Sequence, residues 1–289
     1  MKIGEIHVRD PFIMTARGRY YLYGTRGREA WSDAASGLDV FVSEDLVRWE
    51  GPAEVFTPPE GFWATRDFWA PEVHAYQGAY YMLVSFKSAT ERRGTQILRA
   101  ESPMGPFRPH SDGPVTPRDW ECLDGTLYVD QSGAPWMVFC HEWVQVKDGE
   151  MCAMPLTADL RAAAGAPTVL FHASEPAWAR KGQEDFVTDG PFLYRTAGGR
   201  LLMIWSSFSD NGYVQAVASS QSGEITGPWR HEPLLFDRDG GHGMIFRTLT
   251  GDMYLVIHSP NEWPRERPLL LPLREENDCL VVGGQAEER

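Results

Sequence analysis

Three aspartates occupy comparable places in repeated segments of this chain, and carboxyl groups are well suited to acid and base catalysis. Asp10 lies in RDPFI, Asp124 in LDGTL and Asp189 in TDGPF. Two related segments carry Glu72 in APEVH and His242 in GHGMI. Carboxyl groups that share one depression repel one another, so some of their pKa values rise and one group can donate a proton while another accepts one. Hydrolysis of a glycosidic bond requires such a pair.

The five segments open units of similar length. In each unit an apolar strand, a Gly-centred turn and a second apolar strand follow, which is typical of a β-hairpin. The turn glycines are Gly18, Gly78, Gly133, Gly199 and Gly251. The openings are separated by 62, 52, 65 and 53 residues (10 to 72, 72 to 124, 124 to 189 and 189 to 242).

This repeat predicts an all-β fold, a five-bladed β-propeller. A sandwich or jelly roll is the alternative, but its strands do not repeat the same turn and aromatic signals in register. No linker interrupts the units. We therefore expect one catalytic domain over residues 1–289, with blades opening near residues 10, 72, 124, 189 and 242 and a closing segment at 264–289. The innermost strands would bring the five polar residues together on the axis.

Charge and composition narrow the classes of partner. A formal net charge of −13 argues against binding to nucleic acid or to an anionic membrane and favours a neutral oligosaccharide. No apolar run approaches the ~20 residues of a membrane span, and no apolar signal region follows Met1, so we expect a cytoplasmic protein if this is its natural start. The cysteines show no metal-binding spacing and are expected to be buried free thiols: Cys122, Cys140, Cys152 and Cys279.

Each polar residue also has a structural interpretation. An aspartate before Pro or Gly often caps a turn, although three at comparable places favour function. Glu72, between Pro71 and Val73, is expected to be a buried ion-pair partner. His242, between two glycines, is expected to bind a metal or water on the axis or to make a structural hydrogen bond.

Taken in order, the motifs RDPFI, FWAPEVH, LDGTLYVDQSG, TDGPFLYR and GHGMIFRT resemble glycoside hydrolase family 43, over nearly the whole chain. The resemblance implies that Asp10 is the general base and that Asp124 orients the acid and modulates its pKa. It places the general acid at Asp189, although the family usually has Glu there in an EGP motif. Because Asp is one methylene shorter, Glu184 in the preceding loop is the second choice.

The resemblance also implies substrate-binding residues and a possible ion. An arginine of the closing segment, Arg267 or Arg265, is similar to one that binds substrate in parts of the family. Trp69 and Phe208 are the aromatic residues expected to stack on sugar. No cofactor is required, but Ca²⁺ on the propeller axis is possible, with His242 near it.

The implied function is that of an inverting glycosidase, exo-acting on terminal arabinofuranosyl or xylosyl residues of plant-polysaccharide oligosaccharides. Endo-arabinanase and galactofuranosidase activities are alternatives within the same fold. Retaining fructan and sucrose hydrolases are another, since they carry RDP and EC motifs and this chain has Arg9-Asp10-Pro11 and Glu121-Cys122. A carbohydrate-binding propeller without turnover is the alternative of a different class.

Overall fold

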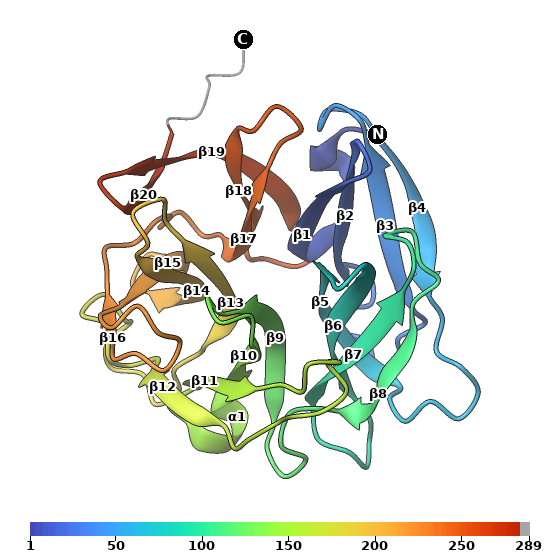
Figure 1. The fold of residues 1–289 in the computed structure, drawn as a ribbon, viewed down its shortest axis with the longest axis horizontal. Coiled ribbons are helices and arrows are strands. Elements are labelled where there is room, and N and C mark those ends of the chain that lie inside the picture. Colours follow the sequence, from blue (N-terminus) through green and yellow to red (C-terminus); the bar gives the residue numbers. More distant parts are fainter. Residues whose placement is uncertain (284–289) are drawn as a thin grey trace.

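The computed structural model describes residues 1–283, whose strands form five four-stranded antiparallel sheets around a central axis (Figure 1). This is the predicted five-bladed β-propeller. Within every blade the strands follow one another in chain order, and the first strand is innermost.

The first three blades span residues 8–172. A short 3₁₀ helix, Ile3–Glu5, precedes them. The first blade comprises β1 (Val8–Ala16), β2 (Arg19–Arg26), β3 (Leu38–Ser43) and β4 (Trp49–Phe56). The second comprises β5 (Arg66–Tyr76), β6 (Ala79–Lys87), β7 (Gly94–Ala100) and β8 (Arg108–Pro114). The third comprises β9 (Cys122–Val129), β10 (Pro135–His141), β11 (Glu150–Pro155) and β12 (Thr168–His172), with helix α1 (Trp143–Val146) between β10 and β11.

The last two blades follow the same plan. The fourth comprises β13 (Asp189–Arg195), β14 (Leu201–Ser209), β15 (Gly212–Ser220) and β16 (Trp229–His231). The fifth comprises β17 (Gly241–Arg247), β18 (Met253–Ser259), β19 (Arg267–Glu276) and β20 (Cys279–Val282).

The predicted hairpin turns lie between the first and second strands of the blades. All five turn glycines have positive φ, from 72° at Gly18 to 95° at Gly251. This left-handed conformation costs glycine little and costs other residues strain. The glycine repeat therefore marked the hairpins correctly.

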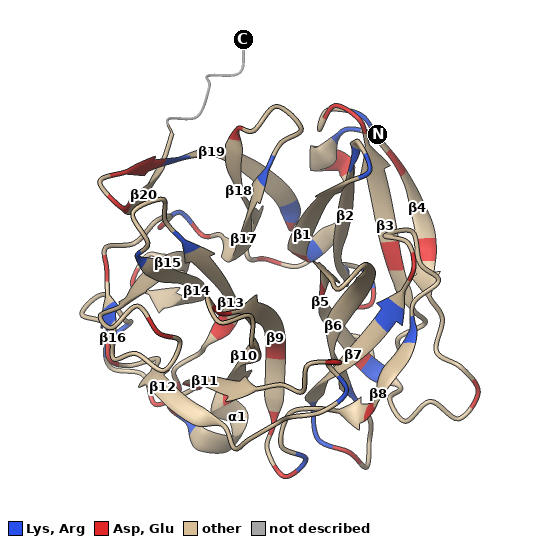
Figure 2. Ribbon diagram, in the orientation of Figure 1, with Lys and Arg blue, Asp and Glu red and all other residues tan. Residues whose placement is uncertain are grey.

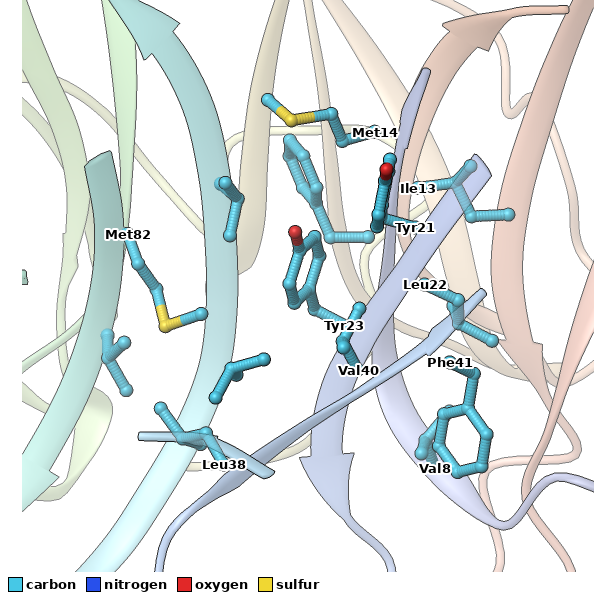
Figure 3. Close-up of a cluster of buried hydrophobic side chains, with 14 of the residues drawn as sticks. Val8, Ile13, Met14, Tyr21, Leu22, Tyr23, Leu38, Val40, Phe41 and Met82 are labelled. Atoms are coloured by element: carbon cyan, nitrogen blue, oxygen red, sulfur yellow. The ribbon is translucent and has the colours of Figure 1, made fainter. Parts of the chain in front are cut away.

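The hydrophobic core fills the spaces between neighbouring blades. Figure 3 shows part of the cluster around the first blade, where Tyr23 of β2 lies beside Val40 of β3 on the side toward Met82 of β6, and Leu22 lies on the opposite side of β2. Because neighbouring blades cover both faces of a sheet, burial need not alternate from one strand residue to the next. Seven consecutive residues of β2, from Tyr20 to Arg26, are buried.

The ring closes through side chains between the first and fifth blades. Arg9 forms an ion pair with Glu266 at 2.6 Å, and the Trp263 indole donates to the Gly27 carbonyl at 2.9 Å. The expected closing segment forms β19 and β20, the outer strands of the fifth blade, and residues 284–289 of that segment lie outside the described residues. Within residues 1–283, no helix has the length and apolar character needed to cross a membrane.

Candidate active site

A one-residue β-bulge interrupts the pairing of every innermost strand with its neighbour. In each innermost strand, one bulge residue has a positive φ between 47° and 58° and is followed by a proline or glycine; β5 has a second bulge, between Arg66 and Trp69, that no proline or glycine follows. The five bulge residues are Asp10, Ala70, Asp124, Gly190 and His242. These positions are therefore the structural equivalents in the five blades.

The expected equivalence of Glu72 and Asp189 with the other polar residues is wrong. Glu72 lies two residues after the bulge position Ala70, and Asp189 lies one residue before Gly190. The proline or glycine after each bulge was the signal that could have given the right alignment. The presence of an acidic residue was a weaker guide to this alignment, because the residue type at equivalent positions differs between the repeats whereas the bulge recurs in all five.

Three aspartates nevertheless converge. Asp10, Asp124 and Asp189 line one pocket together with His242. Figure 2 shows acidic positions on the inner strands β9 and β13, close to the centre of the ring. The other residues of the lining are Arg9, Thr25, Ala30, Trp31, Trp69 and Leu123.

Asp10 is held in its ionised form. Burial alone would raise its pKa, but the charges of His242 and Arg9 and the hydrogen bond from Thr25 lower the pKa below its usual value. The Thr25 hydroxyl donates to Asp10 Oδ2 at 2.5 Å, and His242 Nδ1 lies 3.2 Å from Asp10 Oδ1. Asp10 can therefore accept a proton at neutral pH.

Asp189 has the opposite character. Burial and the nearby carboxyl of Asp124 raise its pKa to about 7, although His242 and a hydrogen bond from Tyr213 oppose that rise. The Tyr213 hydroxyl donates to Asp189 Oδ2 at 2.9 Å. A carboxyl group with this pKa can donate a proton near neutral pH.

The pKa of Asp124, the third aspartate of the pocket, is subject to opposing effects. Burial, followed by the charge of Asp10, raises its pKa well above the usual value, and the hydrogen bond from the Gly190 N–H lowers it. That N–H donates to Asp124 Oδ2 at 3.0 Å. The carboxyl of Asp124 in turn raises the pKa of Asp189. The expectation that some clustered carboxyls have raised pKa values is confirmed.

A second histidine, which sequence analysis missed, supports the backbone of Asp10. The Asp10 N–H donates to His258 Nδ1 at 3.2 Å, and His258 Nε2 lies 3.0 Å from Asn261 Oδ1. Nδ1 is thus an acceptor, which leaves the proton on Nε2. Burial lowers the pKa of His258 to about 4, consistent with a neutral ring. Its place in LVIHSPN, beside the GHG motif, was the available signal.

The expected axial cation does not fit the described residues. Residues 1–283 contain no group of three or more His, Cys, Asp or Glu side chains suited to a metal ion. His242 Nδ1 faces Asp10 Oδ1 and, at 3.7 Å, Asp124 Oδ2. Ca²⁺ prefers about six to eight oxygen ligands, whereas this histidine interacts with carboxylates.

Two other candidate acids lie elsewhere. Glu184 is exposed in the loop before β13 and does not line the pocket. Glu121, the acid of the EC motif, pairs with Lys87 at 2.8 Å and is also absent from the lining. The first observation favours Asp189 over Glu184, and the second removes the support for the retaining alternative. Glu72 is buried and lies 3.0 Å from His74, which agrees with an ion-pair partner.

Of the two aromatic residues predicted to stack on sugar, one lines the pocket and the other does not. Trp69 lines the pocket, with its indole N–H on the Ala30 carbonyl at 2.8 Å and the Arg93 guanidinium 4.3 Å from its ring centroid. Phe208 is not in the lining and packs against Tyr213. Trp31 was missed: it lines the pocket and is 61% exposed.

The predicted arginine is also misplaced. Arg267 donates to the carbonyls of Pro264 and Glu266 and does not line the pocket. Arg9 lines it instead, with its guanidinium 5.1 Å from the Trp31 ring centroid. The RDP motif contained this arginine, but sequence alone did not show that its side chain reaches the pocket.

Known proteins share both the fold and the sequence pattern. An endo-arabinase from Bacteroides thetaiotaomicron VPI-5482 has a solved structure that matches with a TM-score of 0.88 at 39% identity, covering 96% of this chain and 98% of that one. The extracellular endo-alpha-(1->5)-L-arabinanase 1 of Bacillus subtilis (strain 168) is 24% identical over 150 residues, 48% of this chain and 45% of that protein. A probable arabinan endo-1,5-alpha-L-arabinosidase A of Emericella nidulans is 22% identical over 159 residues, 53% of this chain and 48% of that protein.

The matched region thus spans about half the length of these two curated relatives. The model of the glycosyl hydrolases family 43 matches residues 3–275, nearly the whole chain. The resemblance inferred from the repeated motifs is confirmed: the chain belongs to glycosyl hydrolase family 43.

Proposed function

We propose that this protein is an inverting glycoside hydrolase that cleaves α-1,5-linked arabinan. The observation that carries the proposal is the opposite perturbation of two aspartates in one pocket: the pKa of Asp10 is lowered and that of Asp189 is raised to about 7. Environments that separate two carboxyl pKa values assign the base and the acid. A carbohydrate-binding module needs no such pair.

The proposed reaction is a single displacement. Asp10 removes a proton from water as its oxygen attacks the anomeric carbon, and Asp189 protonates the departing glycosidic oxygen. The negative charge of Asp124 raises the pKa of Asp189 and so keeps the proton on Asp189 up to about pH 7. Arg9 and Trp31 also line the pocket and can contact the sugar.

Arabinan is proposed because three similar proteins are named for arabinan hydrolysis. The same names favour cleavage within the polymer over the exo action expected from sequence. Release of terminal arabinofuranosyl or xylosyl residues stays a prediction that product analysis can test.

The decisive experiment compares wild-type protein, Asp10→Asn and the control Asp33→Asn on linear arabinan. We expect Asp10→Asn to lose about 10²–10⁴-fold in kcat, since a positioned general base contributes that much. Asp33 is fully exposed, at 101%, so its variant should match wild type. Wild-type protein that releases no more reducing sugar than Asp10→Asn from arabinan, xylan or nitrophenyl glycosides would contradict the hydrolase proposal.

The reaction products test the stereochemistry of hydrolysis and the choice between endo and exo cleavage. Proton NMR during the first turnovers should show inverted anomers, and retention would exclude Asp10 as a water-activating base. A rapid fall in viscosity with mixed oligosaccharides is expected for endo cleavage. Arabinose as the sole early product would instead support exo action.

A further inference from the structure

A repeated hydrogen bond ties each bulge to the preceding blade. In four of the five junctions, the N–H of the bulge residue donates to a side chain on the second strand of the blade before it. These bonds are Ala70 N to Thr25 Oγ1 at 2.8 Å, Asp124 N to Ser85 Oγ at 2.8 Å, His242 N to Ser206 Oγ at 2.7 Å and Asp10 N to His258 Nδ1 at 3.2 Å. A buried N–H needs such an acceptor.

The junction between the third and fourth blades differs. Its second-strand position, opposite Leu123 on β9, is Cys140. A thiol is a weak acceptor. The Gly190 N–H donates instead to Asp124 Oδ2 at 3.0 Å, so a carboxyl of the site takes the place of the hydroxyl.

The first blade shows what a hydroxyl does at this position. Like Asp124, Asp10 is a bulge aspartate, but Thr25 stands opposite its preceding residue. The Thr25 hydroxyl accepts the Ala70 N–H and donates to Asp10 Oδ2 at 2.5 Å. It therefore binds its own blade's carboxylate and keeps that carboxylate from the next blade's amide.

We propose that Cys140 is a positioning residue for the proposed hydrolysis: by withholding a hydroxyl, it leaves the Gly190 N–H to Asp124 and keeps that carboxyl beside Asp189. The thiol is fully buried, and it lies near both carboxyls. Burial raises the pKa of Cys140 well above its usual value, so it stays neutral. The proposal depends on the proposed function only for its kinetic consequence.

The kinetic consequence depends on the charged groups around Asp124. The charged groups that face Asp124 are Asp10 on β1, Glu72 on β5, Glu142 before α1, Asp189 on β13 and His242 on β17. Because the carboxyl of Asp124 raises the pKa of Asp189, its position relative to Asp189 determines how far that pKa rises. A hydroxyl at position 140 that accepts the Gly190 N–H and donates to Asp124 would draw the Asp124 carboxyl away from Asp189, and the pKa of Asp189 would fall because a nearby negative charge is what raises it.

The test is Cys140→Ser, with kcat measured against pH on linear arabinan. Serine at this position should hold Asp124 as Thr25 holds Asp10, so the alkaline limb of kcat should move down by about one pH unit. At pH values above the limb, kcat should then fall about tenfold, with KM little changed. An unmoved limb would overturn the proposal.

Two variants separate this effect from loss of packing. Cys152→Ser buries the same hydroxyl at another fully buried thiol, on β11, and should lower stability without moving the limb. Cys140→Ala removes the thiol without supplying a hydroxyl, so its limb should stay at the wild-type pH. If Cys140→Ala also moves the limb down, bulk at position 140 is responsible and the proposal fails.

A structural readout makes the test independent of activity. Crystal structures of wild type and Cys140→Ser should show the Gly190 N–H bound to Asp124 Oδ2 in the former and to Ser Oγ in the latter. The buried Thr188 hydroxyl lies beside the Cys140 thiol, so it competes for the new hydroxyl. If serine binds Thr188 and leaves Asp124 in place, the proposal is overturned even if the protein proves inactive on every glycoside.

Discussion

The first and fourth blades contribute the same residue type to one pocket and give it opposite proton affinities. Asp10 accepts a hydrogen bond from Thr25 and lies close to Arg9 and His242. Asp189 has Tyr213 as its donor and lies close to the carboxyl of Asp124. The neighbouring groups, rather than the residue type, therefore determine which aspartate is the base and which is the acid.

The two aspartates also reach the pocket from different registers. Asp10 occupies the bulge itself, whereas the fourth blade has Gly190 there and uses the preceding residue. A Cβ on Gly190 would lie 2.7 Å from Cδ2 of His242, so the imidazole excludes a side chain at that bulge. This packing explains why the carboxyl comes from position 189.

The largest effect is expected when the proton donor, Asp189, is removed. Asp189→Asn should lower kcat on arabinan by about 10²–10⁴-fold, because no proton reaches the leaving oxygen. On nitrophenyl arabinofuranoside the loss should be smaller, since nitrophenolate departs without protonation. Steady-state kinetics on both substrates measure the difference.

Glu184→Gln is the matched control, because Glu184 is exposed and outside the pocket lining. It should retain wild-type kcat on both substrates. A large loss in Glu184→Gln together with full activity in Asp189→Asn would make Glu184 the acid and reverse the assignment.

Much of this arrangement was predictable from sequence, and the failures have physical causes. Five glycine turns and their spacing gave the blades because backbone conformation constrains those positions directly. The aspartates were found because carboxyls before Pro or Gly recur. Arg9 and Trp31 were missed because long side chains reach a pocket according to the packing around them, which the motifs do not encode.

The cysteines illustrate the same limit. Cys122, Cys140 and Cys152 are buried free thiols, as predicted, whereas Cys279 is exposed on β20, the outermost strand of its blade. Apolar flanking sequence indicates burial only where another element covers the strand. The contact of Cys140 with the site needed the register of β9 and β10.

A moderate effect is expected from Thr25→Val, which changes the surroundings of the proposed base, Asp10. The change removes the donor to Asp10 and leaves the Ala70 N–H without its acceptor, which should cost about 1–3 kcal/mol of unfolding free energy. The pKa of Asp10 should rise, so the acidic limb of activity should move to higher pH. Thr25→Ser keeps the hydroxyl and should keep the limb.

Urea unfolding against pH adds a second check on Thr25→Val. Because the folded-state pKa of Asp10 is lowered, its ionised form stabilises the fold above the unfolded pKa of about 4, and this stabilisation is lost as pH falls through the folded pKa. The pKa-dependent part of the destabilisation in Thr25→Val should therefore shrink at acidic pH. A stability difference that is constant with pH, with an unmoved limb, would show that Thr25 does not tune Asp10.

The smallest effect is expected from Tyr213→Phe, which changes the surroundings of the proposed acid, Asp189. The tyrosine hydroxyl lowers the pKa of Asp189, so its removal should raise that pKa and move the alkaline limb of kcat above its position near pH 7. A hydrogen bond worth about 1 kcal/mol corresponds to a shift of about 0.7 pH units. Tyr23→Phe is the control, since the buried Tyr23 hydroxyl donates to the Pro103 carbonyl and is not part of the pocket lining.

Together with Thr25→Val, this variant tests whether the two aspartates are tuned separately. Thr25→Val should narrow the activity profile from its acidic side, and Tyr213→Phe should extend it on the alkaline side. If Tyr213→Phe moves the alkaline limb down, or if Tyr23→Phe moves it equally, the hydroxyl does not set the pKa of Asp189. The proton affinity of the acid would then depend on burial and Asp124 alone.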